Sequence, residues 1–257
     1  MTSQDLENGN TTKGLTGKLG DDAGKWRLTI ASALSLSAQS LIRTPDGFLT
    51  NMSAVVMPNW NGDSTVSFFN PAGNTAQQSF IRLINEGKES SSVTISAIDD
   101  AGQIAPNGDV SLTLGAGKSI EFSASDLEQG DTDMQLMGYL GNGFGRWRLN
   151  VSSQPKIKVM SYVLTSTGFL TNMSEVVGPS SGRHTVWIFN PGSNSNQASK
   201  LRVINNGQDD AAVTITGIDD AGNRGPGSKL TFNLPFNSVK EITAAELKNG
   251  SAEKGLA

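Results

Sequence analysis

Short runs in which apolar and hydroxyl-bearing residues alternate recur along the chain. Residues 93–97 read Val-Thr-Ile-Ser-Ala, and residues 213–218 show the same alternation. A period of two is typical of a strand that turns one face to a core and the other to water. Dipeptides that end in glycine, such as Glu86-Gly87, separate the runs, and glycine accepts the positive φ of tight turns. The pattern predicts many short strands.

Helical signals are confined to two short segments. Residues 123–128 read Ser-Ala-Ser-Asp-Leu-Glu and precede Gly130, and residues 243–247 read Thr-Ala-Ala-Glu-Leu and precede Gly250. Serine and threonine are favoured N-caps, and glycine commonly ends a helix. We therefore expect one capped helical turn in each place.

The chain repeats itself. Trp26 in GKWRLTI recurs as Trp147 in GRWRLNV, an offset of 147 − 26 = 121, and GFLTNMSAVV at 47–56 recurs at 168–177 with one change. A one-residue deletion then reduces the offset to 120, at which Leu127 matches Leu247. The repeat unit is therefore about 120 residues long.

About seven or eight strands fall in each unit, at spacings typical of a sandwich. We therefore expect an all-β chain of tandem immunoglobulin-like β-sandwich repeats. The start of the repeat unit can be chosen in two ways. With the first choice, the chain holds the back half of a unit (1–62), a complete unit (63–183) and the front part of a further unit (184–257), as in a piece cut from a longer array. The alternative register divides the chain into 1–124 and 125–257.

A second fold remains open at this point. Residues 80–84, Phe-Ile-Arg-Leu-Ile, distantly echo Trp26-Arg27-Leu28, which would imply sub-repeats of about 60 residues. Four such sub-repeats would form a propeller-like ring.

The two repeated tryptophans are candidates for the core. In Trp-Arg-Leu-x-Ile/Val the tryptophan shares a strand face with the apolar residues, so Trp26 and Trp147 should be buried. Arg27 and Arg148 should then lie on the opposite face.

The other two tryptophans differ between the copies. Trp60 and Trp187 have no aromatic counterpart, and Trp187 stands between Val186 and Ile188, which should point inward. An outward tryptophan could stack on a sugar or pack against a neighbouring repeat. Packing is the interpretation we favour.

Composition excludes several classes of function. The net charge is −4 and the pI about 5.1, whereas sequence-independent nucleic-acid binding needs a basic surface. The chain has no cysteine, so disulfides and thiolate chemistry are excluded. No apolar run approaches 18 residues, so we expect no membrane insertion.

Catalytic signatures are missing from the sequence. The single histidine, His184, is matched by Ser64 in the other copy, so a histidine-based triad cannot recur in each unit. No Gly-x-Ser-x-Gly elbow precedes a helical segment. We expect a non-enzyme without cofactors, with His184 on an exposed strand.

A pair of adjacent carboxylates recurs in both copies. Asp99-Asp100 and Asp219-Asp220 both precede Ala-Gly. Neighbouring strand residues point to opposite faces, which disfavours a glycosidase pair, and Asp before Ala-Gly suits a turn in which it accepts backbone hydrogen bonds. Calcium ligation by these four residues is the alternative, although their spacing differs from an EF-hand loop.

Five motifs together resemble a known repeat. They are FNPGSNSNQ (189–197), LRVIN (201–205), IDDAG (218–222), GKWRL (24–28) and GFLTNMS (47–53). The combination is similar to a repeat of large bacterial secreted and cell-surface proteins, where it stands beside exported modules such as peptidase domains and has no defined role. The resemblance implies an extracellular or cell-surface location. The first copy departs from it at residues 69–74, where alanine precedes the glycine.

Two functions follow as expectations. The first is a non-catalytic structural or adhesive array whose partners are neighbouring repeats or domains of a longer chain. The second is a module that binds a surface glycan or protein and is attached to an exported hydrolase.

Overall fold

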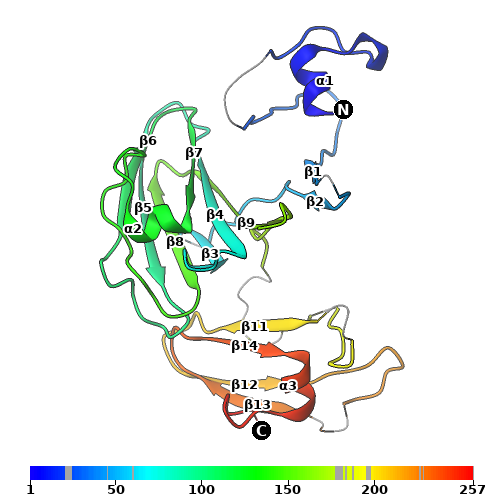
Figure 1. The fold of residues 1–257 in the computed structure, drawn as a ribbon, viewed down its shortest axis with the longest axis vertical. Helices are drawn as coiled ribbons and strands as arrows, with labels where there is room; N and C mark the ends of the chain where they lie inside the picture. The colour runs from blue at the N-terminus through cyan, green and yellow to red at the C-terminus, as the bar shows by residue number, and fades with distance from the viewer. Residues whose placement is uncertain are drawn as a thin grey trace. The chain divides into compact units, whose positions relative to one another are not determined.

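The structure is a computed structural model, and it describes residues 1–20, 25–44, 46–59, 61–176, 182, 184–186, 188–194, 198–225, 227 and 229–256. The chain forms two compact units, Met1–Ala38 and Gln39–Ala257 (Figure 1). The described residues are mostly β, in antiparallel sheets of which none closes into a barrel. None of the described helices is both long and apolar enough to cross a membrane.

The first unit contains helix α1 (Ser3–Asn8) and the short 3-10 helix η1 (Thr11–Lys13). Thr2 caps α1, and its hydroxyl accepts a hydrogen bond from the Asp5 amide. Among described residues 25–38 no strand forms, and Trp26 is 39% exposed while its indole donates to Glu7 at 3.0 Å.

The prediction that Trp26 is buried is therefore wrong. Its counterpart Trp147 begins a strand that two other strands flank, and both of them come earlier in the chain. Among the described residues, no strand flanks the segment that begins at Trp26. The same local sequence consequently forms no sheet there.

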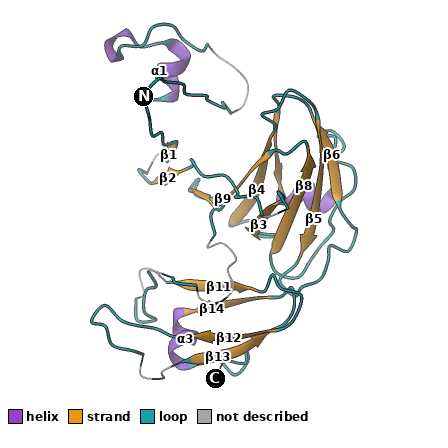
Figure 2. Ribbon diagram, turned by 180° about the vertical axis from the view of Figure 1, so that it is seen from behind, coloured by secondary structure: helices purple, strands orange, loops and turns teal. Residues whose placement is uncertain are grey.

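Residues 63–173 form what we call the middle body, which consists of two four-stranded sheets (Figure 2). The first sheet has the strand order β3 (Ser64–Phe69), β8 (Trp147–Gln154), β5 (Ser91–Ile98), β6 (Val110–Leu114). The second has the order β10 (Leu170–Asn172), β9 (Lys158–Thr165), β4 (Gln77–Ile84), β7 (Ser119–Ser123). All eight strands lie inside the predicted unit 63–183, whose exact boundaries stay a prediction.

Alternation along the strands builds the core of the middle body. In β5, Val93, Ile95 and Ala97 are buried, whereas Ser92 is exposed. Apolar side chains from both sheets form one cluster, so the sheets pack face to face. Trp147 belongs to this cluster and is only 1% exposed, as predicted. The similar sequences of β4 and β8 do not form successive blades of a propeller-like ring. These two strands belong instead to the two facing sheets of one body.

Both predicted helical turns are confirmed. Helix α2 (Ala124–Gln129) is capped by Ser123, and helix α3 (Ala244–Asn249) is capped by Thr243. In each case the N-cap hydroxyl and the acidic residue three positions later exchange hydrogen bonds with the backbone, which forms a capping box.

Residues 198–256 form the C-terminal body, which has two-stranded sheets. Strand β11 (Lys200–Ile204) pairs with β14 (Val239–Thr243), and β12 (Ala211–Ile215) pairs with β13 (Leu230–Leu234). Side chains of β13 and β14 supply most of its small core, which also includes Leu256. This body contains the counterparts of β4 to β7 and α2.

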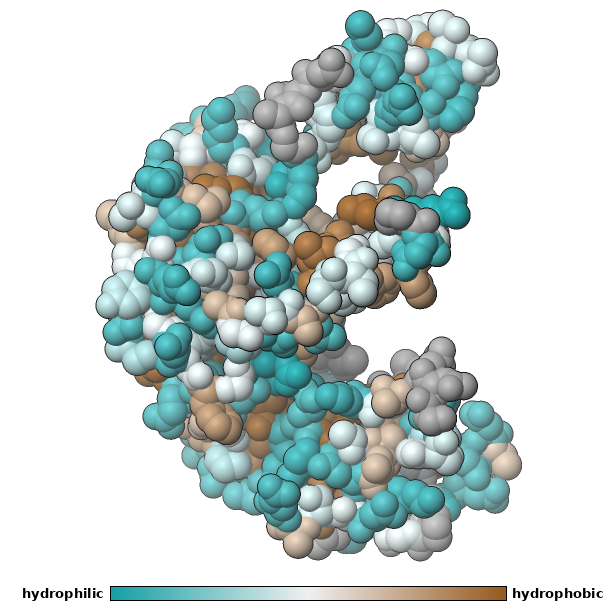
Figure 3. All heavy atoms as spheres, in the orientation of Figure 1, coloured by the Kyte–Doolittle hydropathy of each residue, from teal (hydrophilic) through white to brown (hydrophobic). Residues whose placement is uncertain are grey.

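A short hairpin precedes the middle body. Strands β1 (Leu41–Arg43) and β2 (Leu49–Asn51) pair with each other, and the Phe48 ring meets its repeat counterpart Phe169 edge-on at 5.3 Å. Asn172 of β10 donates to the Ala54 carbonyl at 3.1 Å. Figure 3 shows hydrophobic side chains at the surface over this hairpin, where Phe48 and Leu49 are each 58% exposed.

Candidate functional site

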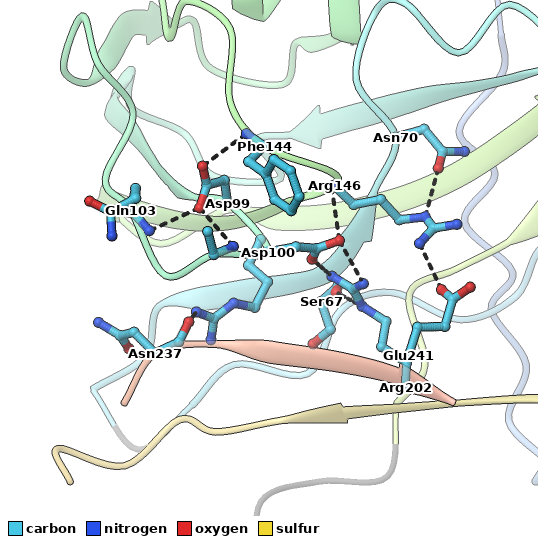
Figure 4. Close-up of polar contacts among 12 residues, drawn as sticks. Ser67, Asn70, Asp99, Asp100, Gln103, Phe144, Arg146, Arg202, Asn237 and Glu241 are labelled. Carbon is cyan, nitrogen blue, oxygen red and sulfur yellow. Dashed lines mark hydrogen bonds and ion pairs between the residues drawn. The ribbon is translucent and has the colours of Figure 1, made fainter. Parts of the chain in front are cut away.

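The Asp-Asp-Ala-Gly segment of the middle body forms the predicted turn. One Asp99 carboxylate oxygen accepts from the amides of Ala101 and Gln103, both at 2.9 Å. The other accepts from the Phe144 amide at 2.9 Å (Figure 4). Both carboxylate oxygens of Asp99 thus hold backbone amides in place.

The second copy of the turn has the same construction. One Asp219 carboxylate oxygen accepts from the amides of Ala221 and Asn223, at 3.0 and 2.7 Å. These hydrogen bonds to the charged form, led by the one from Asn223, lower the pKa of Asp219. The sequence pattern therefore predicted both turns correctly.

Asp100 points away from the turn and toward the C-terminal body. Its carboxylate forms a two-pronged ion pair with Arg202, with Nη2–Oδ1 at 2.6 Å and Nη1–Oδ2 at 3.3 Å (Figure 4). It also accepts from the Arg146 amide at 3.0 Å. The side chains of Asp100 and Arg202 are only 17% and 13% exposed. This burial strengthens their ion pair relative to one on the open surface.

In a second ion pair the arginine belongs to the middle body and the carboxylate to the C-terminal body. Arg146 of the middle body donates to Glu241 of β14 at 2.7 Å, and its Nε donates to Asn70 at 3.1 Å. The guanidinium groups of Arg146 and Arg202 lie over the Phe68 ring, 4.8 and 5.6 Å from its centroid. The Phe68 ring thus contacts one arginine from each of the two salt bridges.

Arg148 adds a third arginine to this contact. Its Nη1 donates to Asn206 at 3.0 Å, and its Nη2 donates to the Asn237 carbonyl. The side chain is buried, and burial together with the nearby Arg202 charge lowers its pKa. The sequence placed Arg148 on the face opposite Trp147, and that face is covered by the C-terminal body.

The backbones also meet here. The Val239 amide donates to the Asp100 carbonyl at 3.2 Å. Gly102 has φ +84°, and a Cβ atom there would lie 3.2 Å from the Phe236 carbonyl oxygen. Glycine therefore serves both the turn and the close approach. We call the contact of Asp100, Arg146 and Arg148 with Arg202, Asn206, Asn237 and Glu241 the junction.

The junction brings three arginines and two carboxylates together. Each carboxylate in it is already engaged by arginine or backbone donors. Among the described residues, no group of three or more His, Asp or Glu side chains could hold a metal ion. Calcium independence of the four aspartates stays a prediction, and Asp220 is exposed.

Junction positions recur in the repeat. Arg202 and Glu241 correspond to Arg82 and Glu121 at an offset of 120, and in the middle body this pair lies 3.8 Å apart. On the other side of the contact, Asp100 corresponds to Asp220. The sequence analysis did not identify the junction, because a single sequence gives no sign of which sheets meet.

Other predicted positions lie away from the junction or outside the described residues. His184 is exposed but not in a strand, contrary to expectation. Val186 and Ile188 were expected to point inward, yet they are 50% and 85% exposed, because among the described residues no counterpart of β8 flanks them. Trp60 and Trp187 lie outside the described residues.

No family model, curated protein or solved structure matches this chain.

Proposed function

We propose that the chain is a non-catalytic structural array of an extracellular bacterial protein, built from immunoglobulin-like repeats that the junction holds in a fixed orientation. The resemblance of its motifs to repeats of secreted proteins supports the location. The two facing sheets of the middle body support the type of repeat.

One observation carries the proposal: the junction joins successive repeats through side chains that the repeat itself carries. Arg202 and Glu241 have counterparts in Arg82 and Glu121, and Asp100 has one in Asp220. Such a contact can propagate along an array, since the middle unit bears Asp100 of one half and, in Arg82 and Glu121, counterparts of the other half. Paired, partly buried ions also fix register and orientation.

Rigidity at the junction is the property to measure. Because the chain has no cysteine, spin labels can be placed at Thr113→Cys in β6 and Thr231→Cys in β13, both exposed positions. Double electron–electron resonance should give one narrow distance distribution. Asp100→Ala and Arg202→Ala should each broaden it, because each removes one side of the ion pair.

The control is Arg224→Ala, which removes an exposed arginine of the C-terminal body. It should leave the distribution unchanged. A broad distribution in the otherwise unaltered chain would refute a fixed orientation. In a double-mutant cycle the Asp100–Arg202 coupling should be about 1.5–3 kcal/mol, the range for hydrogen bonds to charged groups.

A further inference from the structure

The guanidinium group of Arg148 has one donor that its neighbours in the protein do not satisfy. Arg148 is 6% exposed, and its Nη1 and Nη2 donate to Asn206 and Asn237. Among the described residues, no atom accepts a hydrogen bond from its Nε. A buried donor without a partner costs free energy, and an arginine cannot avoid that cost by losing its proton. The Nε–H group therefore calls for an acceptor from solution.

A pocket of about 140 Å³ lies beside Arg148. The other polar side chains that line it come from the outer face of the first sheet and from two loops of the C-terminal body, and they are Thr65, Ser96, Asn150, Asn206 and Asn237. Thr65, Ser96 and Asn150 are only partly buried, so ions from solution can reach the pocket. Since a water molecule occupies about 30 Å³ in the liquid, the pocket has room for a small ion and some water.

The polar groups around the pocket include several donors. The amide oxygen of Asn150 accepts from the Thr65 hydroxyl at 3.4 Å, and that of Asn206 accepts from Arg148 at 3.0 Å. An amide whose oxygen is engaged in this way has its NH2 group to donate. Together with the Arg148 Nε–H and the Ser96 hydroxyl, these groups form a set of donors that suits an anion.

The charges around the pocket are not balanced. Arg146 and Arg202 each have a carboxylate partner in the junction. Lys200 shares Glu241 at 3.0 Å, and Asp99 adds a negative charge that acts on Arg148. These groups, with Arg148 itself, carry four positive and three negative charges. The excess positive charge favours a monovalent anion, and partial burial of the arginine strengthens that preference.

The other copy of the repeat has a carboxylate in this region. At an offset of 120, Asn206 corresponds to Glu86 and Asn237 corresponds to Gly117. The middle body thus has an acidic side chain at a position where the C-terminal body has a neutral amide. Where the amide replaces the acid, the negative charge can come from solution.

We infer that this pocket binds a small monovalent anion, either a halide ion or a carboxylate group, which accepts from the Arg148 Nε–H and from the amides of Asn150 and Asn206. Hydrogen bonds between an ion and such donors are stronger than those between neutral groups. Because the lining comes from both bodies, the bound anion stabilises the junction. This binding site goes beyond the structural role proposed above.

Chloride is the first probe of the site in the full chain. The width of the chloride NMR signal measures binding, because an ion held by a protein relaxes faster than a free ion. The chain should broaden the signal, and the effect should saturate as chloride is added. Formate, which carries a carboxylate group and little else, then identifies the source of the anion. Displacement of chloride by formate assigns the pocket to carboxylates as well as halides, whereas no displacement assigns it to halides.

Asn150→Asp separates the site from the fold. The change is nearly isosteric, and the new carboxylate can still accept from Thr65. It places a negative charge in the pocket, so the affinity for chloride should fall at least about tenfold. Asn206→Glu, which installs the residue of the other copy, should weaken binding in the same way. The control is Asn142→Asp, which adds the same charge at an exposed position outside the pocket and should leave chloride binding unchanged.

Equal broadening by Asn150→Asp, by Asn142→Asp and by the unaltered chain would mean that chloride meets only the general surface, and it would overturn the inference. So would a chloride signal that the unaltered chain does not broaden. The spin-label experiment measures orientation without reference to chloride. A narrow distance distribution combined with no chloride binding would therefore refute the anion site and leave the proposed function standing.

Discussion

Replacing Trp147 by alanine should destabilise the middle body strongly. The ring is 1% exposed and packs against Gly143, where a Cβ atom would come within 2.4 Å of it. Its indole donates to the buried Glu128 at 2.7 Å. Truncation of a buried tryptophan costs about 3–5 kcal/mol through lost burial and the cavity left behind. The lost hydrogen bond to the Glu128 carboxylate adds to that cost.

The repeat supplies a matched control in Trp26→Ala. Trp26 stands in a similar sequence and its indole donates to a glutamate in the same way, to Glu7, but it is 39% exposed and lies in none of the described sheets. Its loss should cost less than about 1 kcal/mol. Hydrogen exchange of peptides from β5 and β8, followed through a urea titration, measures the stability of the middle body separately. A cost below about 1 kcal/mol for Trp147→Ala would refute the burial argument.

Three further outcomes are expected. Asn85→Ala should cost the middle body about 2–4 kcal/mol in urea unfolding, because the Asn85 amide donates to three backbone carbonyls and its oxygen accepts a fourth bond. Removing calcium with EDTA and restoring it should shift Tm by less than about 1 °C, since Asp99 and Asp219 already accept backbone amides. Glu246, hydrogen-bonded by Lys254, has a pKa lowered to about 2 from 4.5, so its contribution to stability is present above pH 4.5 and is lost as pH falls toward 2. Thermal unfolding across that range should show the loss, and Glu246→Gln should lack it.

Local structure was largely predictable from the sequence. Alternation in residues 93–97 identified β5 and its buried face, and the Ser123 and Thr243 signals located α2 and α3. The two Asp turns followed from the chemistry of Asp before Ala-Gly. Each of these features is decided by residues within a few positions of one another, so a single sequence contains the needed information.

Burial was less predictable, because it depends on distant strands. Trp26 and Trp147 share a local pattern, yet of the two only Trp147 has flanking strands among the described residues. Val186 and Ile188 failed as inward residues for the same reason. A strand face becomes a core face only when its neighbours are present, and periodicity carries no information about neighbours.

The contacts of the polar side chains at the junction were hard to predict for the same reason. Arg82 and Arg202 occupy one repeat position, but Arg82 lies 3.8 Å from Glu121 of its own sheet, whereas Arg202 reaches Asp100 of the preceding body at 2.6 Å. The difference comes from what stands across the outer face, since the arginine and the glutamate beside it are present in both copies. The contacts of one repeat position therefore depend on what lies across its face: Arg82 pairs within its own sheet, whereas Arg202 reaches the middle body.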